Sequence, residues 1–314
     1  MRYIMEKPFQ ITILGSSAAT PTSLRHTTSQ LLQVHNRRFL LDCSEGTQMQ
    51  LRRYKIPVMG INHVFISHLH GDHYLGLPGL LFSMHLLGRD HDFHVYSPPG
   101  LQEIIELQFR ASGLKPVYET RFHEITAGRQ LVFEDECLTA EAIEMNHRIP
   151  CFGYLFREKP SPQNIIKEAI SRYDIPVSAI PAIKQGKDFV TAKGVTIPNA
   201  EITRPRSKPR SYAFCSDTAY TETFLDQIMG VDLLYHEATF LNDKADIARK
   251  KTHSTTTEAA AIAKKAGAGK LLIGHYSARY KDLAAFKREA RAVFPNTCIA
   301  EEGDVISIDA RTVA

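Results

Sequence analysis

The stretch HLHGDH, residues 68–73, decides the fold class, because it follows the apolar run VFIS, residues 64–67, and places four potential metal ligands within six residues. Alternate side chains of a β-strand share a face, so the first two histidines point the same way. The glycine lets the backbone turn, which brings the aspartate and the third histidine toward them. A polar loop that happens to be rich in histidine is the alternative. The pattern predicts a metal site where a strand ends.

Length and composition place the chain among ordinary globular proteins. Its 314 residues are enough to bury a large core, so folding does not depend on a metal. With 43% hydrophobic and 23% charged residues, neither a disordered nor a fibrous chain is indicated. No apolar run approaches the length of a membrane span, and the N-terminus carries no secretory leader. We therefore expect a cytoplasmic protein that does not enter a membrane.

Cysteine does not account for the metal site. The five cysteines are scattered and form no CxxC pair. In a cytoplasmic chain this pattern is typical of reduced, buried thiols, and it indicates neither disulfides nor thiolate-bound zinc.

Positive charge gathers in one segment. The net charge is +4, yet residues 157–210 contain eleven lysines and arginines against five acidic residues. A basic segment is typical of a protein with a polyanionic partner, and solvated loop charge is the alternative. Residues 157–198 also hold five prolines and only one plausible helix, near residues 164–173. This composition predicts an insertion that protrudes from the compact part of the chain.

Short apolar runs alternate with amphipathic stretches along the rest of the chain. In the first half we expect strands at residues 10–14, 29–34, 38–42 and 63–67, and helices at 46–53, 76–87 and 101–111. In the second half we expect strands at 138–145, 212–216, 233–236 and 271–274, and helices at 221–229, 255–266 and 282–293. This mixed order predicts a layered α/β architecture in which two sheets pack together with helices outside.

Three further potential ligands, His147, Asp217 and His275, each end an apolar run, where sites in α/β sheets commonly lie. Either histidine alone could be a strand-end side chain with no ligand role. Together with the opening run they make a set of seven: His68, His70, Asp72, His73, His147, Asp217 and His275. Seven ligands are too many for one tetrahedral zinc but fit two metal ions that share a carboxylate. Nitrogen and carboxylate ligands suit Zn²⁺, with Mn²⁺ or Fe²⁺ possible, and a pair of such ions indicates hydrolysis.

Asp42 also invites interpretation as a ligand, but we expect its carboxylate to orient a metal-bound imidazole instead.

The HxHxDH run and the three later ligands resemble the metallo-β-lactamase superfamily. Further motifs resemble the short form of ribonuclease Z, a family of tRNA 3′-processing endonucleases: LDCSEGTQ (residues 41–48), HEATF (236–240), HST (253–255) and GHYSARY (274–280). The resemblance runs from about Ile11 to Ile308. It implies a four-layer αββα sandwich in which residues 1–314 form one domain. It also implies that residues 157–198 are a flexible arm that binds tRNA.

The resemblance assigns roles residue by residue. It makes His68, His70 and His147 ligands of one zinc, Asp72, His73 and His275 ligands of the other, and Asp217 the bridge. Asp72 would also be the general base. Glu237 and His253 match the pair that protonates the departing 3′ oxygen of the tRNA. As alternatives, Glu237 could cap or orient the site, and His253 could N-cap the helix that starts near Ser254.

The resemblance also implies two Zn²⁺ ions per subunit, precursor tRNA as the substrate, and a homodimer in which the arm of one subunit serves the other's active site. Arg279 could hold a substrate phosphate or pair with a helix carboxylate, and Lys184 and Lys187 are expected to contact the tRNA from the arm. Residues 174–180 lack the Gly-Pro pair expected in the arm, so the shape of the arm is open.

The sequence thus predicts a zinc-dependent endoribonuclease that removes the 3′ trailer from precursor tRNA and leaves a 3′-hydroxyl. Two alternatives remain at this point. One is a hydrolase of a small phosphodiester, sulfate ester or thioester, and the other is a non-catalytic RNA-binding subunit on the same fold.

Overall fold

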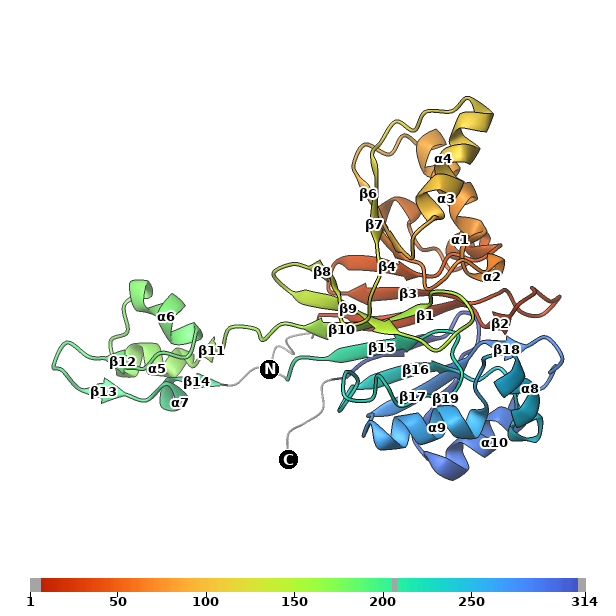
Figure 1. Cartoon of the computed structure of the whole chain (residues 1–314). Coiled ribbons are helices and arrows are strands. Elements are labelled where there is room, and N and C mark those ends of the chain that lie inside the picture. The colour runs from red at the N-terminus through yellow and green to blue at the C-terminus, as the bar shows by residue number, and fades with distance from the viewer. Residues whose placement is uncertain (1–6, 205–207, 310–314) are drawn as a thin grey trace.

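Two seven-stranded sheets form the centre of the protein, whose computed structural model describes residues 7–204 and 208–309 (Figure 1). The first sheet consists, in spatial order, of β20 (Val305–Ser307), β1 (Phe9–Gly15), β3 (Ser29–Val34), β4 (Arg37–Leu41), β5 (His63–Phe65), β6 (Phe93–Ser97) and β7 (Thr120–Glu124). The second consists of β19 (Thr297–Ile299), β17 (Lys270–Gly274), β16 (Leu233–Glu237), β15 (Ser211–Cys215), β10 (Phe152–Glu158), β9 (Leu138–Glu144) and β8 (Leu131–Glu134). Both sheets mix parallel and antiparallel pairs.

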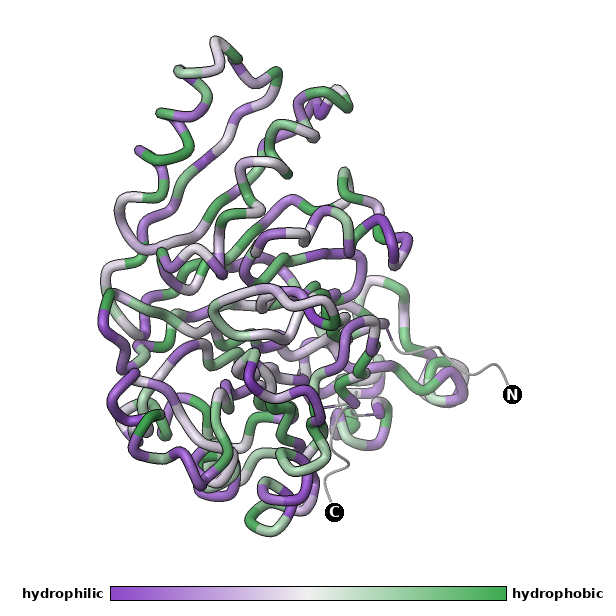
Figure 2. The backbone as a smooth tube through the Cα atoms, turned by 90° about the vertical axis from the view of Figure 1, so that its right-hand side faces the viewer, coloured by the Kyte–Doolittle hydropathy of each residue, from purple (hydrophilic) through white to green (hydrophobic). Residues whose placement is uncertain are grey.

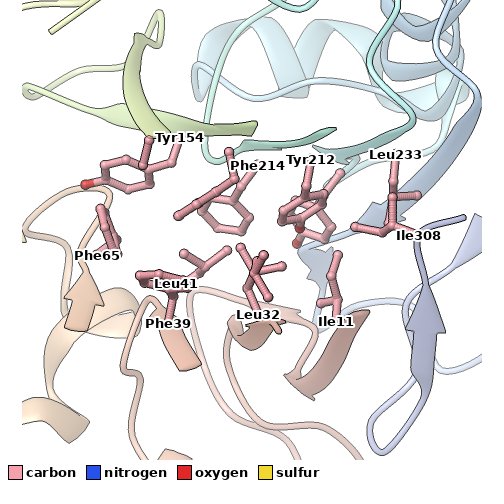
Figure 3. Packing of buried hydrophobic residues seen from close by; sticks show 14 of the residues in the cluster. Ile11, Leu32, Phe39, Leu41, Phe65, Tyr154, Tyr212, Phe214, Leu233 and Ile308 are labelled. Carbon is pink, nitrogen blue, oxygen red and sulfur yellow. The ribbon is translucent and has the colours of Figure 1, made fainter. Parts of the chain in front are cut away.

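The hydrophobic core lies between the two sheets. Figure 3 shows Phe39, Leu41 and Phe65 of the first sheet facing Tyr154 and Phe214 of the second. The rings of Phe65 and Tyr154 meet edge to face, with their centroids 5.0 Å apart. Aromatic rings bury large areas and favour such packing. The two sheets therefore form a rigid base for the loops at their ends.

Helices cover the outer face of each sheet. On the first sheet these are α1 (Thr47–Arg53), α3 (Gly76–Leu86) and α4 (Leu101–Ser112), and on the second α9 (Thr256–Lys265) and α10 (Ala284–Val293). Two shorter helices are α2 (Gly71–Tyr74) and α8 (Ala245–Lys250), and a small strand pair joins β2 (Ser17–Ala18) to β18 (Tyr276–Ser277). The four-layer αββα sandwich is confirmed, and outside the insertion the predicted elements agree with the observed ones to within about two residues, with one exception. Within the insertion, the single helix expected near residues 164–173 is wrong in part, because residues 164–165 form a strand, the helix begins at Lys167, and a second helix covers residues 180–184.

The exception is the helix expected at residues 221–229, which is wrong. The segment is a series of turns in which Leu225, Gln227 and Ile228 each donate a backbone hydrogen bond to the residue three positions earlier, at 3.1–3.2 Å. The side-chain amide of Gln227 also donates to the Ala142 carbonyl of β9 at 3.0 Å. Contacts with the sheet therefore outweigh the local helical pattern.

The sequence analysis did not predict strand β10, because its residues do not alternate between apolar and polar as those of a half-exposed strand do. Residues 152–156 are all buried, so the run shows no alternation between apolar and polar side chains. A run buried on both faces has no periodic signature.

The basic insertion forms a lobe that protrudes from one end of the sandwich, drawn in green in Figure 1. Its elements are β11 (Asn164–Ile165), α5 (Lys167–Arg172), α6 (Ile180–Lys184), β12 (Phe189–Val190), β13 (Thr196–Ile197), α7 (Asn199–Ile202) and β14 (Thr203–Arg204). The lobe has a small core of its own: Ala169, Ile175, Ile183, Phe189, Ile197 and Ile202. Strands β11 and β14 pair and close it, so the described lobe extends past residue 198 to Arg204.

An ion pair joins the two stems of this lobe at its base. The Arg210 guanidinium donates from Nε to Glu158 Oε2 at 2.9 Å and from Nη2 to Oε1 at 2.7 Å. His35 Nε2 lies 2.9 Å from Glu158 Oε1. Burial opposes ionisation of Glu158, but the hydrogen bonds and charge of Arg210 hold the pKa of its carboxyl below the usual value. The charged form of Glu158 therefore stabilises the folded state.

We expect this stabilisation to depend on pH. Because the pKa of Glu158 is lower in the folded than in the unfolded chain, its contribution is present at neutral pH and is lost as the pH falls through the folded pKa. Replacing Glu158 by glutamine should cost about 2 kcal/mol at pH 7. The difference between wild type and variant should shrink below about pH 4. Urea unfolding from pH 7 to 3 measures it, and a difference that stays constant over this range would contradict the assignment.

No helix in residues 7–204 and 208–309 is long and apolar enough to cross a membrane. Figure 2 agrees, since hydrophilic and hydrophobic segments alternate along the tube.

Candidate metal centre

All seven predicted ligands lie at one edge of the sandwich, beyond the carboxyl ends of their strands. His147 follows β9, Asp217 follows β15 and His275 follows β17. Strand β5 ends at Phe65, so His68 and His70 lie in the loop after it and not on a continued strand. The chain then turns at Gly71 into α2, which carries Asp72 and His73. Four segments far apart in sequence thus meet at one place.

Three imidazoles and one carboxylate form the first cluster. His70 Nδ1 lies 2.9 Å from His68 Nε2 and 3.3 Å from His147 Nε2. Asp217 Oδ2 lies 3.6 Å from His68 Nε2. Zinc–nitrogen bonds of about 2.0–2.1 Å in a tetrahedron separate two ligand atoms by roughly 3.3 Å. The four atoms therefore have the spacing of ligands to one ion.

The second cluster consists of Asp72, His73 and His275. Asp72 Oδ2 lies 3.4 Å from His73 Nε2 and 3.6 Å from His275 Nε2. Asp217 reaches this cluster too, with Oδ1 3.1 Å from His275 Nε2 and Oδ2 3.6 Å from His73 Nε2. The Asp217 carboxylate therefore stands between the two clusters.

Orphaned polar atoms indicate that this arrangement fits metal ions. His73 Nε2, His275 Nε2 and Asp217 Oδ1 are buried without a hydrogen-bond partner in the described part of the chain. Buried polar atoms are nearly always paired, so three orphans at one place call for a common partner. A divalent cation satisfies all three. The clusters supply only nitrogen and oxygen, a donor set that suits zinc and similar ions.

Hydrogen bonds on the far side of the His73 and His147 rings orient them toward the centre. His73 Nδ1–H donates to Asp42 Oδ2 at 2.7 Å, and the Ser67 backbone N–H donates to Asp42 Oδ1 at 2.7 Å. His147 Nδ1–H donates to the Thr252 carbonyl at 3.0 Å. With Nδ1 protonated, Nε2 of each ring is left free to bind a cation. Asp42 thus lies beside the His73 imidazole, one of the predicted ligands.

Thr239 orients the His275 ring in the same way, and the sequence analysis did not identify this residue. His275 Nδ1–H donates to Thr239 Oγ1 at 2.8 Å, and this hydroxyl donates to Glu237 Oε2 at 2.8 Å. The only signal in the sequence is its position in the HEATF motif.

Glu237 is fully buried and accepts several hydrogen bonds, and this position limits how it can take part in catalysis. Its carboxylate also accepts hydrogen bonds from the backbone N–H groups of Thr218, Thr239 and Ser254 at 2.9–3.1 Å. His253 Nδ1–H donates to Glu237 Oε1 at 2.9 Å. Glu237 therefore reaches the centre through the His253 and His275 rings and not with its own oxygens.

His253 lies at the edge of the centre, with Nδ1 3.9 Å from Asp217 Oδ2. Burial lowers its pKa, but the Glu237 and Asp217 carboxylates raise it to about 9, so the ring is protonated at neutral pH. The alternative interpretation as a helix cap is wrong, because α9 is capped by Thr255 in a capping box with Glu258.

The backbone is strained around the centre. Asp42, Thr252 and His275 adopt left-handed conformations with φ of 54–60°. Such values are uncommon for residues other than glycine and gather at functional sites.

The three predicted substrate contacts are not brought together. Arg279 is exposed after β18 and has no ion-pair partner within residues 7–204 and 208–309, so no helix carboxylate holds it. Lys184 and Lys187 lie on the lobe, at the opposite end of the sandwich from α2 and β18 (Figure 1).

The contact with Asp42 gives a testable expectation. In the Asp42→Asn variant the amide NH₂ faces His73 Nδ1, which favours the tautomer protonated at Nε2 and unable to bind metal. Metal affinity should fall about 10- to 100-fold. Metal content after dialysis against graded chelator measures the loss. Asp135→Asn, which removes a carboxylate paired with Arg37 away from the centre, is the control and should keep its metal.

Comparisons with known proteins agree with this geometry over most of the chain. A family model described as "Anti-Pycsar protein Apyc1" matches residues 9–156, less than half of the chain. "Ribonuclease Z" of Bacteroides fragilis is 44% identical over 305 residues, which cover 97% of this chain and 100% of that protein. "Ribonuclease Z" of Parabacteroides distasonis is 46% identical over 303 residues, or 96% of this chain and 99% of that protein.

Solved structures show the same architecture. The human tRNase Z, short form, superimposes with a TM-score of 0.70 at 27% identity and covers 96% of this chain and 99% of that one. The metallo-beta-lactamase fold protein YhfI from Bacillus subtilis has a TM-score of 0.68 at 22% identity, covers 96% of this chain and 100% of that one, and shows the fold.

Proposed function

Because the chain belongs to the ribonuclease Z family, we propose that it is a zinc-dependent endoribonuclease that removes the 3′ trailer from precursor tRNA and leaves a 3′-hydroxyl. The observation that carries the proposal is the convergence of two His/Asp clusters around Asp217 in a chain that matches its relatives nearly end to end. We place this activity in the cytoplasm.

Two zinc ions per subunit complete the centre in this proposal. His68, His70 and His147 would hold one, Asp72, His73 and His275 would hold the other, and Asp217 would contribute to both. When bound, zinc ions supply Lewis-acid stabilisation of phosphoryl oxygens and lower the pKa of water. The three orphaned atoms described above support this set.

Two side chains of the centre carry out the two proton transfers, one as the base and the other as the acid. Asp72 is the general base, and its Oδ2 is held in place by the backbone N–H of Ala19 at 2.8 Å. Protonated His253 donates to the departing 3′ oxygen. Glu237 positions His253 and keeps it charged, and Arg279, which makes no ion pair with the described residues, holds a substrate phosphate.

The lobe grips the tRNA body. Residues 1–314 form one domain in this proposal, and the arm, expected at 157–198 and extending in the structure to Arg204, carries Lys184 and Lys187 as phosphate contacts. Because the lobe projects away from its own metal centre, it serves the centre of a second subunit, which requires a homodimer.

The direct test mixes metal-loaded protein with a precursor tRNA and maps the product end, with zinc and manganese compared. We expect a single cut beside the discriminator base and a free 3′-hydroxyl. Absence of that cut, while a small phosphodiester is hydrolysed, would contradict the proposal.

A further inference from the structure

A polar pocket opens beside the metal centre and has no role in the mechanism above. Its volume is about 570 Å³, within the range of about 300–1,000 Å³ that is usual for ligand sites. Its lining comes from residues 128–129, from the end of β9 with the loop that follows it (144–147), and from the turns at 221–227. His147 belongs to this lining, and its Nε2 lies 3.3 Å from His70 Nδ1 in the first cluster. One side chain is thus shared by the pocket and the metal centre.

Contacts between its walls give the pocket its shape without a ligand. Arg129 Nη2 donates to both carboxylate oxygens of Asp226, at 2.6 and 2.7 Å, and this ion pair ties the first wall to the turns. The side-chain amide of Gln227 holds the same turns against Ala142 of β9. The turns that replace the expected helix at 221–229 therefore form one wall of a preformed pocket.

Asn146, which precedes the ligand His147, has a fixed backbone and an unpaired side chain. Its N–H donates to Thr218 Oγ1 at 3.1 Å, and its carbonyl accepts from the Ala219 N–H at 2.9 Å. The side chain is exposed, and its amide makes no hydrogen bond with the described residues. A side-chain amide carries two donors and one acceptor. Asn146 can therefore pair with a ligand edge that presents both a donor and an acceptor.

The other polar groups of the lining are also mixed in character. The Thr221 hydroxyl donates to Thr223 Oγ1 at 3.2 Å and accepts from the Thr223 N–H at 3.3 Å, which leaves the Thr223 hydroxyl hydrogen free to donate. Glu144 is exposed and makes no ion pair within residues 7–204 and 208–309. Among the described residues of the lining, the one arginine is Arg129, which is paired with Asp226, and there is no lysine. This set disfavours a phosphate and favours an uncharged group with a hydrogen-bonding edge.

The floor of the pocket is apolar. Met145 is 5% and Phe224 3% exposed, and both side chains belong to the core beneath the pocket. A nucleobase combines an apolar face with an edge of hydrogen-bond donors and acceptors. The apolar floor and the polar rim match these two features.

We propose that this pocket receives the base of a nucleotide next to the bond that is cut, and that Asn146 pairs with the edge of that base. The inference rests on the proposed function for the identity of the strand, and on Glu144, Asn146 and Thr223 for the chemistry of the pocket. A phosphate at the metal centre is separated from the pocket by the His147 side chain, so the base of an adjoining nucleotide reaches it. Asn146 is therefore a specificity-determining residue of the reaction.

The test replaces Asn146 by alanine in the metal-loaded protein. Four precursor tRNAs that differ only in the nucleotide before the cut, and four that differ only in the nucleotide after it, give kcat/KM for each base. Wild type should prefer one base at one of these positions by about tenfold or more, which is the discrimination that a bidentate contact provides. Asn146→Ala should remove this preference and raise KM for the preferred substrate about tenfold, with kcat within about threefold of wild type.

Asn296→Ala is the matched control. Asn296 is also exposed, but it precedes β19, at the opposite end of the parallel strands from the metal centre. This variant should keep the wild-type base preference and KM. Metal content should equal that of wild type in both variants, because neither substitution removes a ligand.

A wild type without base preference at either position overturns the inference, as does an Asn146→Ala variant that retains the preference. Titration with the four ribonucleosides, followed by NMR, is a second readout that does not depend on RNA cleavage. Wild type and Asn296→Ala should bind one nucleoside about tenfold more tightly than Asn146→Ala, and equal affinities also overturn the inference. Failure of the wild type to cut precursor tRNA contradicts the proposed function instead, and the nucleoside titration then decides the pocket separately.

Discussion

Replacing Asp217 by asparagine is expected to lower kcat for precursor tRNA about 10³-fold, an effect of the size seen when one main electrostatic group of an active site is removed. The Asp217 carboxylate lies within 3.6 Å of His68, His73 and His275, so it is the one side chain common to both clusters. Asparagine keeps the shape but removes the charge that holds two cations together. Metal content and single-turnover rates measure the two losses together.

A buried carboxylate elsewhere gives the control for Asp217→Asn. Asp232 precedes β16, is 7% exposed and accepts hydrogen bonds from the Ser211 N–H and hydroxyl at 2.8 Å. Asp232→Asn should lower stability but keep full metal content and kcat. If Asp217→Asn retained both metal equivalents and its rate, the bridging role would be wrong.

Removing the lobe should separate RNA cleavage from phosphodiester chemistry. Residues Asn164 and Arg204 are paired across β11 and β14, so a short Gly-Ser linker can replace residues 164–204 without stretching the chain. The lobe has its own core, and its loss leaves the core between the sheets covered. We expect kcat/KM for precursor tRNA to fall about 10³-fold, because several phosphate contacts are lost. Hydrolysis of bis(p-nitrophenyl) phosphate should stay within about twofold.

A charge-reversal variant of the intact lobe controls for misfolding of the deletion variant. Lys184→Glu/Lys187→Glu leaves the lobe core unchanged, since Lys187 is exposed and Lys184 half-buried. It should weaken precursor tRNA binding and reduce its salt dependence. If both the deletion and the charge reversal cut precursor tRNA at the wild-type rate, the lobe is not the tRNA-binding arm.

The positions of the candidate ligands at strand ends could be predicted because each follows an apolar run, and such a run can be recognised from neighbouring residues. The error at residues 221–229 has the opposite cause. There the local pattern is helical, but Gln227 and Phe224 are held by the second sheet, which no neighbouring residue reveals. The roles of Thr239 and Ser67 were missed for the same reason, since their partners lie on other segments.

Residues 68–73 alone bring four candidate ligands together, because a short loop that follows a strand and turns into a helix is a local property of the chain. The basic excess of residues 157–210 is likewise readable from the chain alone. Folding adds what local spacing does not contain. His147, Asp217 and His275 come from strands far apart in sequence, and they join the site only because two packed sheets align the ends of those strands. The same packing orients His73, His147 and His275 through hydrogen bonds on the far sides of their rings, and it directs the lobe away from the metal centre of its own subunit.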